Sequence, residues 1–204
     1  MATSAEREKI QEILSRDEYR SNLAGRNFPL GLRILNQSNK IVTASTFFYV
    51  LATRSLASAY FGLGAIGCMV FAKILKEILR EKRPVGTTYK ITYGMPSTHS
   101  ATISYYATFI ALAATRLPVH PSLSSVPPKF INPIAPVLMT VTSLVICISR
   151  IRLGHHTLKQ VGGGITVGTL FGLGWFAWWS TGGAQDIAWG VVEYLPSFLR
   201  SYIR

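Results

Sequence analysis

Long apolar stretches alternate with short segments that carry most of the charge in this chain. Five stretches contain no Asp, Glu, Lys, Arg or His: Ile41–Thr53, Ser55–Ala72, Ser100–Thr115, Phe130–Ser149 and Gln160–Gln185. All but the first approach or exceed the roughly 17–25 residues that a helix needs to cross a bilayer. The pattern predicts an all-α fold, a polytopic membrane helical bundle with about five to six membrane helices.

The apolar stretches differ in how firmly they predict a span. Ile41–Thr53 is short, and it stays open between a tilted span and half of a buried hairpin. Ser55–Leu75 is predicted to span and to continue as a helix beyond the bilayer until Pro84, because no helix breaker intervenes. Ile187–Leu199 contains a glutamate and a proline and is predicted to be interfacial or weakly inserted.

The chain divides into two predicted parts. Residues 1–40 are expected to form an amphipathic, interfacial N-terminal segment, with a thin apolar stripe and a capping box formed by Thr3 and Glu6. Residues 41–204 are expected to form the membrane-embedded domain. Within it, Gly164, Gly168 and Gly172 recur every four residues, which favours close packing inside the bundle over dimerisation.

Composition and charge narrow the class of protein. The 204 residues are 49% hydrophobic with a formal charge of +12, and their mean hydropathy is +0.29. The basic residues flank apolar spans instead of lining an aromatic-studded soluble face, so nucleic acid is not an expected partner. Anionic lipids or phosphorylated substrates fit the charge better. No metal-ligand set is apparent, and no cofactor is expected.

Two basic segments lie between the second and third apolar stretches. The first holds Lys76 and Arg83, which are seven residues apart and are predicted to share one face of the helical extension. The second is Pro96-Ser97-Thr98-His99, predicted to open a helix whose unpaired N–H groups suit an anion. Taken alone, a segment of this kind is more often a simple helix cap with a histidine at an interface.

A third basic segment, residues 149–160, follows the fourth apolar stretch. If a helix begins near His156, the amide oxygen of Gln160 can accept a hydrogen bond from the His156 ring and hold one tautomer. Arg150 and His156 can reach one ligand only if the chain bends, and Gly154 permits a bend. The alternative interpretation of this segment alone is a set of interfacial charges.

Topology makes the three basic segments converge. No span separates the first from the second and two spans separate the second from the third, so all three are expected on one face of the bilayer. The candidate site residues are Lys76, Arg83, Ser97, Thr98, His99, Arg150, His156 and Gln160.

The three segments resemble the three-part signature of the type 2 phosphatidic acid phosphatase and vanadium haloperoxidase superfamily. The matching residues are Lys76-(six residues)-Arg83-Pro84, Pro96-Ser97-Thr98-His99 and Ser149-Arg150-(five residues)-His156, within residues 55–180. The resemblance implies that His156 is the nucleophile, forming a phosphohistidine, and that His99 is the general acid. It also implies phosphoryl-oxygen contacts from Lys76, Arg83 and Arg150, with Ser97 and the neighbouring backbone at Thr98 assisting. Rigid cationic donors of this kind stabilise a phosphoryl group in transfer without a metal.

Two positions depart from the usual pattern of that superfamily. Thr98 stands where glycine is usual, and Gln160 stands where aspartate is usual; a neutral amide can orient His156 but gives an imidazolium little Coulomb stabilisation. The run from His156 to Val161, with Gly94-Met95-Pro96-Ser97, is similar to the dolichyl diphosphatases of the endoplasmic reticulum. That resemblance implies removal of the terminal phosphate of dolichyl diphosphate in support of protein N-glycosylation.

Other readings stay open. The same chemistry is possible on phosphatidate, a sphingoid-base phosphate or a shorter isoprenoid diphosphate, and Gln160 leaves room for a catalytically silent lipid-binding scaffold. Haloperoxidase activity ranks last for a membrane-bound chain. The positive-inside rule favours a cytosolic active face, whereas the resemblance implies a lumenal one in the endoplasmic reticulum membrane, which we expect. The sequence leaves the oligomeric state open.

Overall fold

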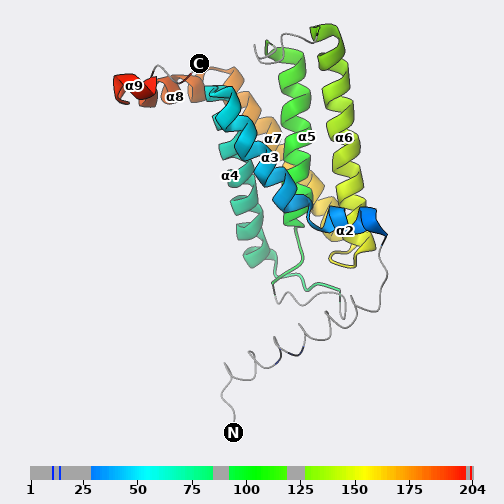
Figure 1. The fold of residues 1–204 in the computed structure, drawn as a ribbon. Coiled ribbons are helices and arrows are strands. Elements are labelled where there is room, and N and C mark those ends of the chain that lie inside the picture. Colours follow the sequence, from blue (N-terminus) through cyan, green and yellow to red (C-terminus); the bar gives the residue numbers. More distant parts are fainter. Residues whose placement is uncertain are drawn as a thin grey trace.

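The computed structural model describes residues 29–84, 92–118 and 127–200, together with Gln11, Leu14 and Ile203. The regular elements of this described part are all helices (Figure 1). The all-helical prediction is therefore confirmed for these residues. The capping box predicted at Thr3 and Glu6, and nearly all of the segment predicted before residue 29, lie outside the described residues.

Four long helices form the bundle, and shorter ones surround it. Helix α5 lies between α4, α6 and α7 and packs against all three, while α3 crosses the bundle obliquely and α8 and α9 extend sideways from one end, beyond α7 (Figure 1). In chain order the helices are α2 (Leu30–Asn36), α3 (Ser38–Thr53), α4 (Leu56–Leu79), α5 (Thr98–Arg116), α6 (Pro128–Arg152), α7 (Leu158–Ser180), α8 (Gly183–Glu193) and α9 (Ser197–Arg200).

Three of the described helices, α4, α6 and α7, are long and apolar enough to cross a membrane. Their outer faces expose large apolar side chains such as Ile66, Val141 and Leu170, which suit contact with lipid. The predicted number of five to six spans is not confirmed. Helix α3 has only 16 residues, and α5 is less apolar because much of its surface contacts other helices, with Ser100, Ser104 and other side chains buried there.

The glycines of α7 bring it close to α5. A Cβ atom added to Gly164 would lie 2.6 Å from the carbonyl oxygen of Ser97, and one added to Gly168 would overlap the backbone of Ala101. These distances leave no room for a side chain, so the two helices meet backbone to backbone. The predicted role of the glycines in packing within the bundle is confirmed.

Helix α4 ends earlier than predicted. It passes Leu75 and includes Lys76, but it stops at Leu79, where Arg80 adopts a left-handed conformation with φ 49°. Four non-helical residues then run to Pro84, so Arg83 does not share a helical face with Lys76, and that prediction is wrong. The reason is that the chain turns away here, and the carbonyl of Glu81 accepts a hydrogen bond from the Gly94 N–H at 2.6 Å.

Candidate active site

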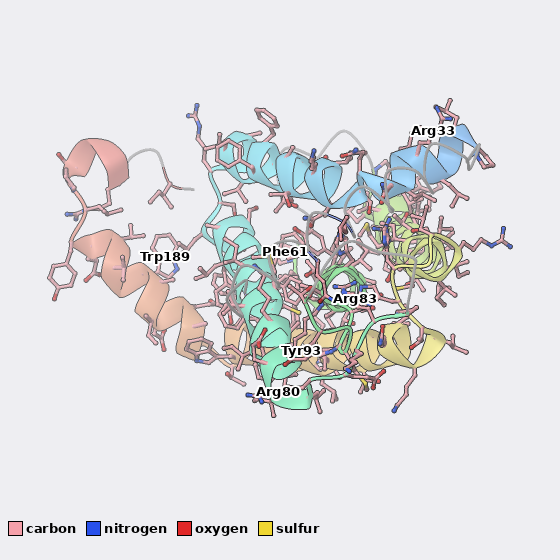
Figure 2. The ribbon with its side chains drawn as sticks, turned by 90° about the horizontal axis from the view of Figure 1, so that it is seen from below. Arg33, Phe61, Arg80, Arg83, Tyr93 and Trp189 are labelled. Carbon is pink, nitrogen blue, oxygen red and sulfur yellow. The ribbon has the colours of Figure 1, made fainter. Side chains whose placement is uncertain are left out.

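The three basic segments lie at one end of the bundle, as the predicted topology requires. This end holds the C-terminal ends of α4 and α6 and the N-terminal ends of α5 and α7 (Figure 1). Figure 2 looks onto it from below: Arg83 lies towards the middle of the bundle, whereas Arg80 lies at the rim beside α4. Arg80 and Arg83 are only three residues apart, yet the turn at the end of α4 leaves Arg80 at the rim and brings Arg83 into the site.

A bend after α6 places His156. Helix α6 ends at Arg152, and Gly154 has φ 74°, a left-handed value that favours glycine. The N–H groups of His155 and His156 both fold back to donate to the Arg150 carbonyl, at 3.0 and 3.3 Å. The bend permitted by Gly154 is thus present, and it leaves His156 only 4% exposed.

Gln160 fixes the His156 ring from within α7. Thr157 is the N-cap of this helix: its Oγ1 accepts from the Gln160 N–H at 3.2 Å, and its own N–H donates to Gln160 Oε1 at 3.3 Å. The same Oε1 lies 3.2 Å from Nδ1 of His156. Because the oxygen can only accept, Nδ1 carries the ring proton and Nε2 keeps its lone pair. The predicted hydrogen bond is confirmed.

Arg83 occupies the other side of the ring. Its Nη1 lies 3.2 Å from Nε2 of His156 and donates to the His155 carbonyl at 3.0 Å, while its Nε donates to the Thr92 carbonyl at 2.9 Å. Lys76, which is 7% exposed, donates from Nζ to the Tyr93 carbonyl at 3.3 Å. Two adjacent carbonyls before α5 therefore hold both cations at the site.

The surroundings of His156 favour its neutral form. Burial, followed by the positive charges of Arg83 and Lys76, lowers the pKa of His156 from 6.5 to about 3, against the opposing effect of its bond to Gln160. His99 adds a smaller lowering of the same pKa. Burial also lowers the pKa of Arg83. A neutral imidazole with a lone pair beside two cations is suited to attack an electrophile that carries negative charge.

The start of α5 differs in detail from the prediction. Ser97 is the N-cap and is fully buried; its Oγ accepts from the Ser100 N–H at 3.5 Å. Its own N–H was predicted to be unpaired, but it donates to the carbonyl of Gln160 at 3.0 Å. Ser97 therefore ties α5 to α7. Thr98 and His99 open the helix and are partly exposed at the site.

Arg150 is held beside this group of residues by α2. Its side chain is 2% exposed, and its guanidinium donates from Nη2 to the carbonyl of Leu35 and to Ser149 Oγ, the latter at 3.2 Å. Next to it, His155 Nε2 lies 3.1 Å from Oδ1 of Asn36. The structure thus gathers Lys76, Arg83, His99 and Gln160 around His156, and it engages the Arg150 side chain with the end of α2.

Several contributors were missed by sequence reasoning. Thr157 had a readable signal, since Thr-x-x-Gln before an apolar run is a capping-box pattern. Asn36 and Tyr93 had none, because each acts by proximity in the fold. Glu81 also had none: its Oε1 accepts from Gln160 Nε2 at 3.1 Å across 79 residues of sequence. Among the described residues, no group of three or more His, Cys, Asp or Glu side chains is arranged to hold a metal ion.

Comparisons with known proteins show the family of the chain. A family model, the PAP2 superfamily, matches residues 55–183. The chain is 28% identical over 140 residues to a protein named dolichyldiphosphatase from Saccharomyces cerevisiae, a match that covers 65% of this chain and 56% of the relative. It is also 28% identical over 151 residues to lipid phosphate phosphatase epsilon 1, chloroplastic, from Arabidopsis thaliana, covering 72% and 50%. The chain spans about half the length of these curated relatives.

A solved structure shares the fold. It is the crystal structure of the first transmembrane PAP2 type phosphatidylglycerolphosphate phosphatase, from Bacillus subtilis. The two chains superpose with a TM-score of 0.53 at 20% identity, over 96% of this chain and 90% of the other. At this identity, the likeness supports the arrangement of the helices.

Proposed function

The chain belongs to the PAP2 superfamily, and from this premise we propose that it is a membrane lipid phosphatase that removes the terminal phosphate of dolichyl diphosphate. The observation that carries the proposal is the state of the His156 ring. Its Nδ1 is hydrogen-bonded to Gln160 and its Nε2 faces Arg83. The nucleophilic lone pair on Nε2 is therefore directed to the position where Arg83 would bind a phosphoryl group.

In the first step the lone pair of His156 Nε2 attacks the terminal phosphorus. A P–N bond forms as the bond from phosphorus to the leaving oxygen breaks, and His99 gives that oxygen a proton. Arg83 exchanges its contact with Nε2 for the phosphoryl oxygens, which Lys76 also neutralises. Arg150 exchanges its bond to the Leu35 carbonyl for another of these oxygens. Such charge stabilisation is the main catalytic contribution in phosphoryl transfer.

In the second step water attacks the phosphorus of the phosphohistidine. His99, now neutral, takes a proton from the water as the P–N bond breaks, and the electron pair returns to Nε2 of His156. Inorganic phosphate leaves, and both histidines are restored. The Nδ1–H of His156 keeps its bond to Gln160 in both steps, so the ring does not rotate.

Two observations bear on the lipid. The glutamine at position 160 and the relative named dolichyldiphosphatase favour dolichyl diphosphate. The Arabidopsis lipid phosphate phosphatase, at the same 28% identity, favours a second candidate, another lipid phosphate such as phosphatidate. Both candidates use the same residues, so the choice rests on the lipid tail and the leaving group.

The experiment is phosphate release by detergent-purified protein in the presence of a metal chelator. Dolichyl diphosphate, farnesyl diphosphate and phosphatidate are compared side by side, with His156→Ala as the blank. His155→Ala is the matched control. It removes the His155 ring, which hydrogen-bonds Asn36 and not His156, and it keeps the His155 backbone carbonyl that accepts from Arg83. We expect the polyprenyl diphosphates to be strongly preferred, the blank to be silent and the control to be active.

Each other outcome has a definite meaning. Preference for phosphatidate would select the second candidate. Activity retained in His156→Ala would remove His156 as the nucleophile. Release of no phosphate from any of the three lipids would leave the chain as a silent lipid-binding scaffold.

We also propose that α5 is a further span and that the site faces the lumen of the endoplasmic reticulum, with residues 1–40 at the interface. The exposed Leu30 and Ile34 of α2 support the interfacial placement. Cys68 and Cys147 are buried, so introduced cysteines can report topology. In sealed microsomes, a membrane-impermeant maleimide should label Ser124→Cys and spare Thr88→Cys; the reverse pattern would place the site in the cytosol.

A further inference from the structure

Every hydrogen-bonding atom of the Gln160 side chain has a fixed partner. Its Oε1 faces His156 Nδ1 and the Thr157 N–H, and its Nε2 donates to the Lys82 carbonyl at 2.8 Å and to Glu81 Oε1 at 3.1 Å. The side chain is fully buried. A flipped amide would set its NH₂ against the Thr157 N–H and its oxygen against two acceptors, the Lys82 carbonyl and Glu81 Oε1, so the observed orientation is the stable one.

The Glu81 carboxylate is therefore connected to the His156 ring through one amide group. Hydrogen bonds in a chain polarise one another, so a negative charge on the NH₂ side of the amide makes Oε1 a stronger acceptor. Oε1 is the atom that receives the Nδ1–H of His156. Positive charge develops on that ring when its Nε2 bonds to phosphorus, and a stronger acceptor at Nδ1 stabilises it.

From this arrangement we propose that Glu81 is a positioning residue that acts on His156 through Gln160. The inference rests on the proposed function for its kinetic consequence, but the orientation of the His156 ring is independent of any substrate. Gln160 alone orients the His156 ring, and the negative charge of Glu81 makes the Gln160 oxygen a stronger acceptor for the Nδ1–H of that ring. The other oxygen of Glu81 lies 3.5 Å from Nζ of the exposed Lys159, which leaves Oε1 for the amide.

The close approach of the loop before α5 supports this role. A Cβ atom on Gly94 would lie 2.6 Å from both Cδ and Oε1 of Gln160, so the amide is also confined sterically. The Gly94 N–H donates to the backbone carbonyl of Glu81. That bond survives any substitution of the Glu81 side chain, so a variant at position 81 removes the carboxylate and keeps the turn.

The first test compares kinetic constants of Glu81→Ala and Glu81→Gln with the wild type. Outer partners of an active group typically contribute about 10–100-fold, so we expect kcat of Glu81→Ala to fall by that factor with KM nearly unchanged. Glu81→Gln should fall less, because its amide oxygen still accepts from Gln160 Nε2 while the charge is lost. Glu77→Ala and Glu77→Gln are matched controls, since Glu77 is exposed on the last turns of α4.

A second test separates the Glu81 role from general damage and from the proposed function. Glu81→Ala in a Gln160→Ala background should have no further effect on kcat, because the link to His156 is already broken. Nitrogen NMR of labelled histidine should show the Nδ1–H tautomer of His156 in the wild type and a tautomer mixture in Glu81→Ala. The NMR readout stands even if no lipid phosphate is hydrolysed.

Several outcomes would overturn the proposal. They are wild-type kcat and an unchanged tautomer in Glu81→Ala, a change confined to KM, equal losses in the Glu77 variants, or full additivity with Gln160→Ala. A loss of thermal stability in Glu81→Ala that accounts for the lost activity would likewise reduce Glu81 to a structural role.

Discussion

The two ends of the bundle are held together by different interactions. At the site end, buried polar groups are joined by directional hydrogen bonds, with His156 between Gln160 and Arg83. At the opposite end, aromatic rings pack together: Tyr60 stacks on Trp175 with ring centroids 4.7 Å apart. Hydrogen bonds among buried polar groups add little net stability but specify geometry, whereas ring packing contributes mainly stability. Activity and stability should therefore separate along the bundle.

The largest expected effect is loss of activity without loss of stability in Arg83→Gln. Removing a charged donor from a developing oxyanion costs about 10²–10³-fold in rate, so kcat/KM should fall by that factor. The midpoint of thermal unfolding should stay near the wild-type value. Arg80→Gln is the matched control, because Arg80 bonds the Glu77 carbonyl at the surface. Equal losses in both variants would show that net charge, and not the contact with His156, matters.

Loss of stability is expected from a substitution midway between the ends, where α5 and α7 touch. In Gly168→Ala the new methyl group collides with the backbone of Ala101, and overpacking of this kind costs about 1–3 kcal/mol. Gly174→Ala on the same helix meets nothing within 4 Å and should be neutral or slightly stabilising. Thermal unfolding of the two variants in one detergent measures the difference. Similar midpoints would contradict the close helix contact.

Acid should weaken the site end through His156. Its pKa is about 3 in the folded chain against 6.5 ordinarily, so below pH 6.5 the unfolded chain binds a proton that the folded chain does not. Stability is thus lost as pH falls, by about 1.4 kcal/mol at pH 5.5. The free energy of unfolding of His156→Gln should not show this loss at low pH, whereas that of His155→Gln should still show it. Unfolding free energies at pH 7.5 and 5.5 test the difference.

The sequence predicted which residues form the site better than it predicted the backbone conformation that brings them there. The pairing of His156 with Gln160 follows from helical spacing, and the bend at Gly154 from the conformational freedom of glycine. The end of α4 was misplaced because Arg80 takes a left-handed conformation that no residue preference signals. Arg83 consequently reaches the ring from a loop.

Contacts between distant segments explain the remaining errors. The pairing of Ser97 N–H with the Gln160 carbonyl depends on how closely α7 approaches α5. The predicted number of spans is not confirmed, because only α4, α6 and α7 of the described helices are both long and apolar enough to cross a membrane. Helix α5 shows why: surrounded by other helices, it carries buried serines and tyrosines that lower its hydropathy. Burial by protein and burial by lipid require different compositions, and spacing does not distinguish them.

The smallest expected effect tests the aromatic end alone. Tyr60 donates from its hydroxyl to the Trp175 carbonyl at 2.8 Å, and Trp175 Nε1 donates back to the Tyr60 carbonyl at 3.2 Å. Tyr60→Phe removes the first bond and keeps the stacked ring, so it should cost about 1 kcal/mol of stability and leave kcat/KM unchanged. Tyr194→Phe, at a side chain 91% exposed, is the control and should change neither quantity. A fall in kcat/KM without a fall in stability would mean that the two ends are coupled through α4 and α7, and that the polar network around His156 depends on packing at the far end of the bundle.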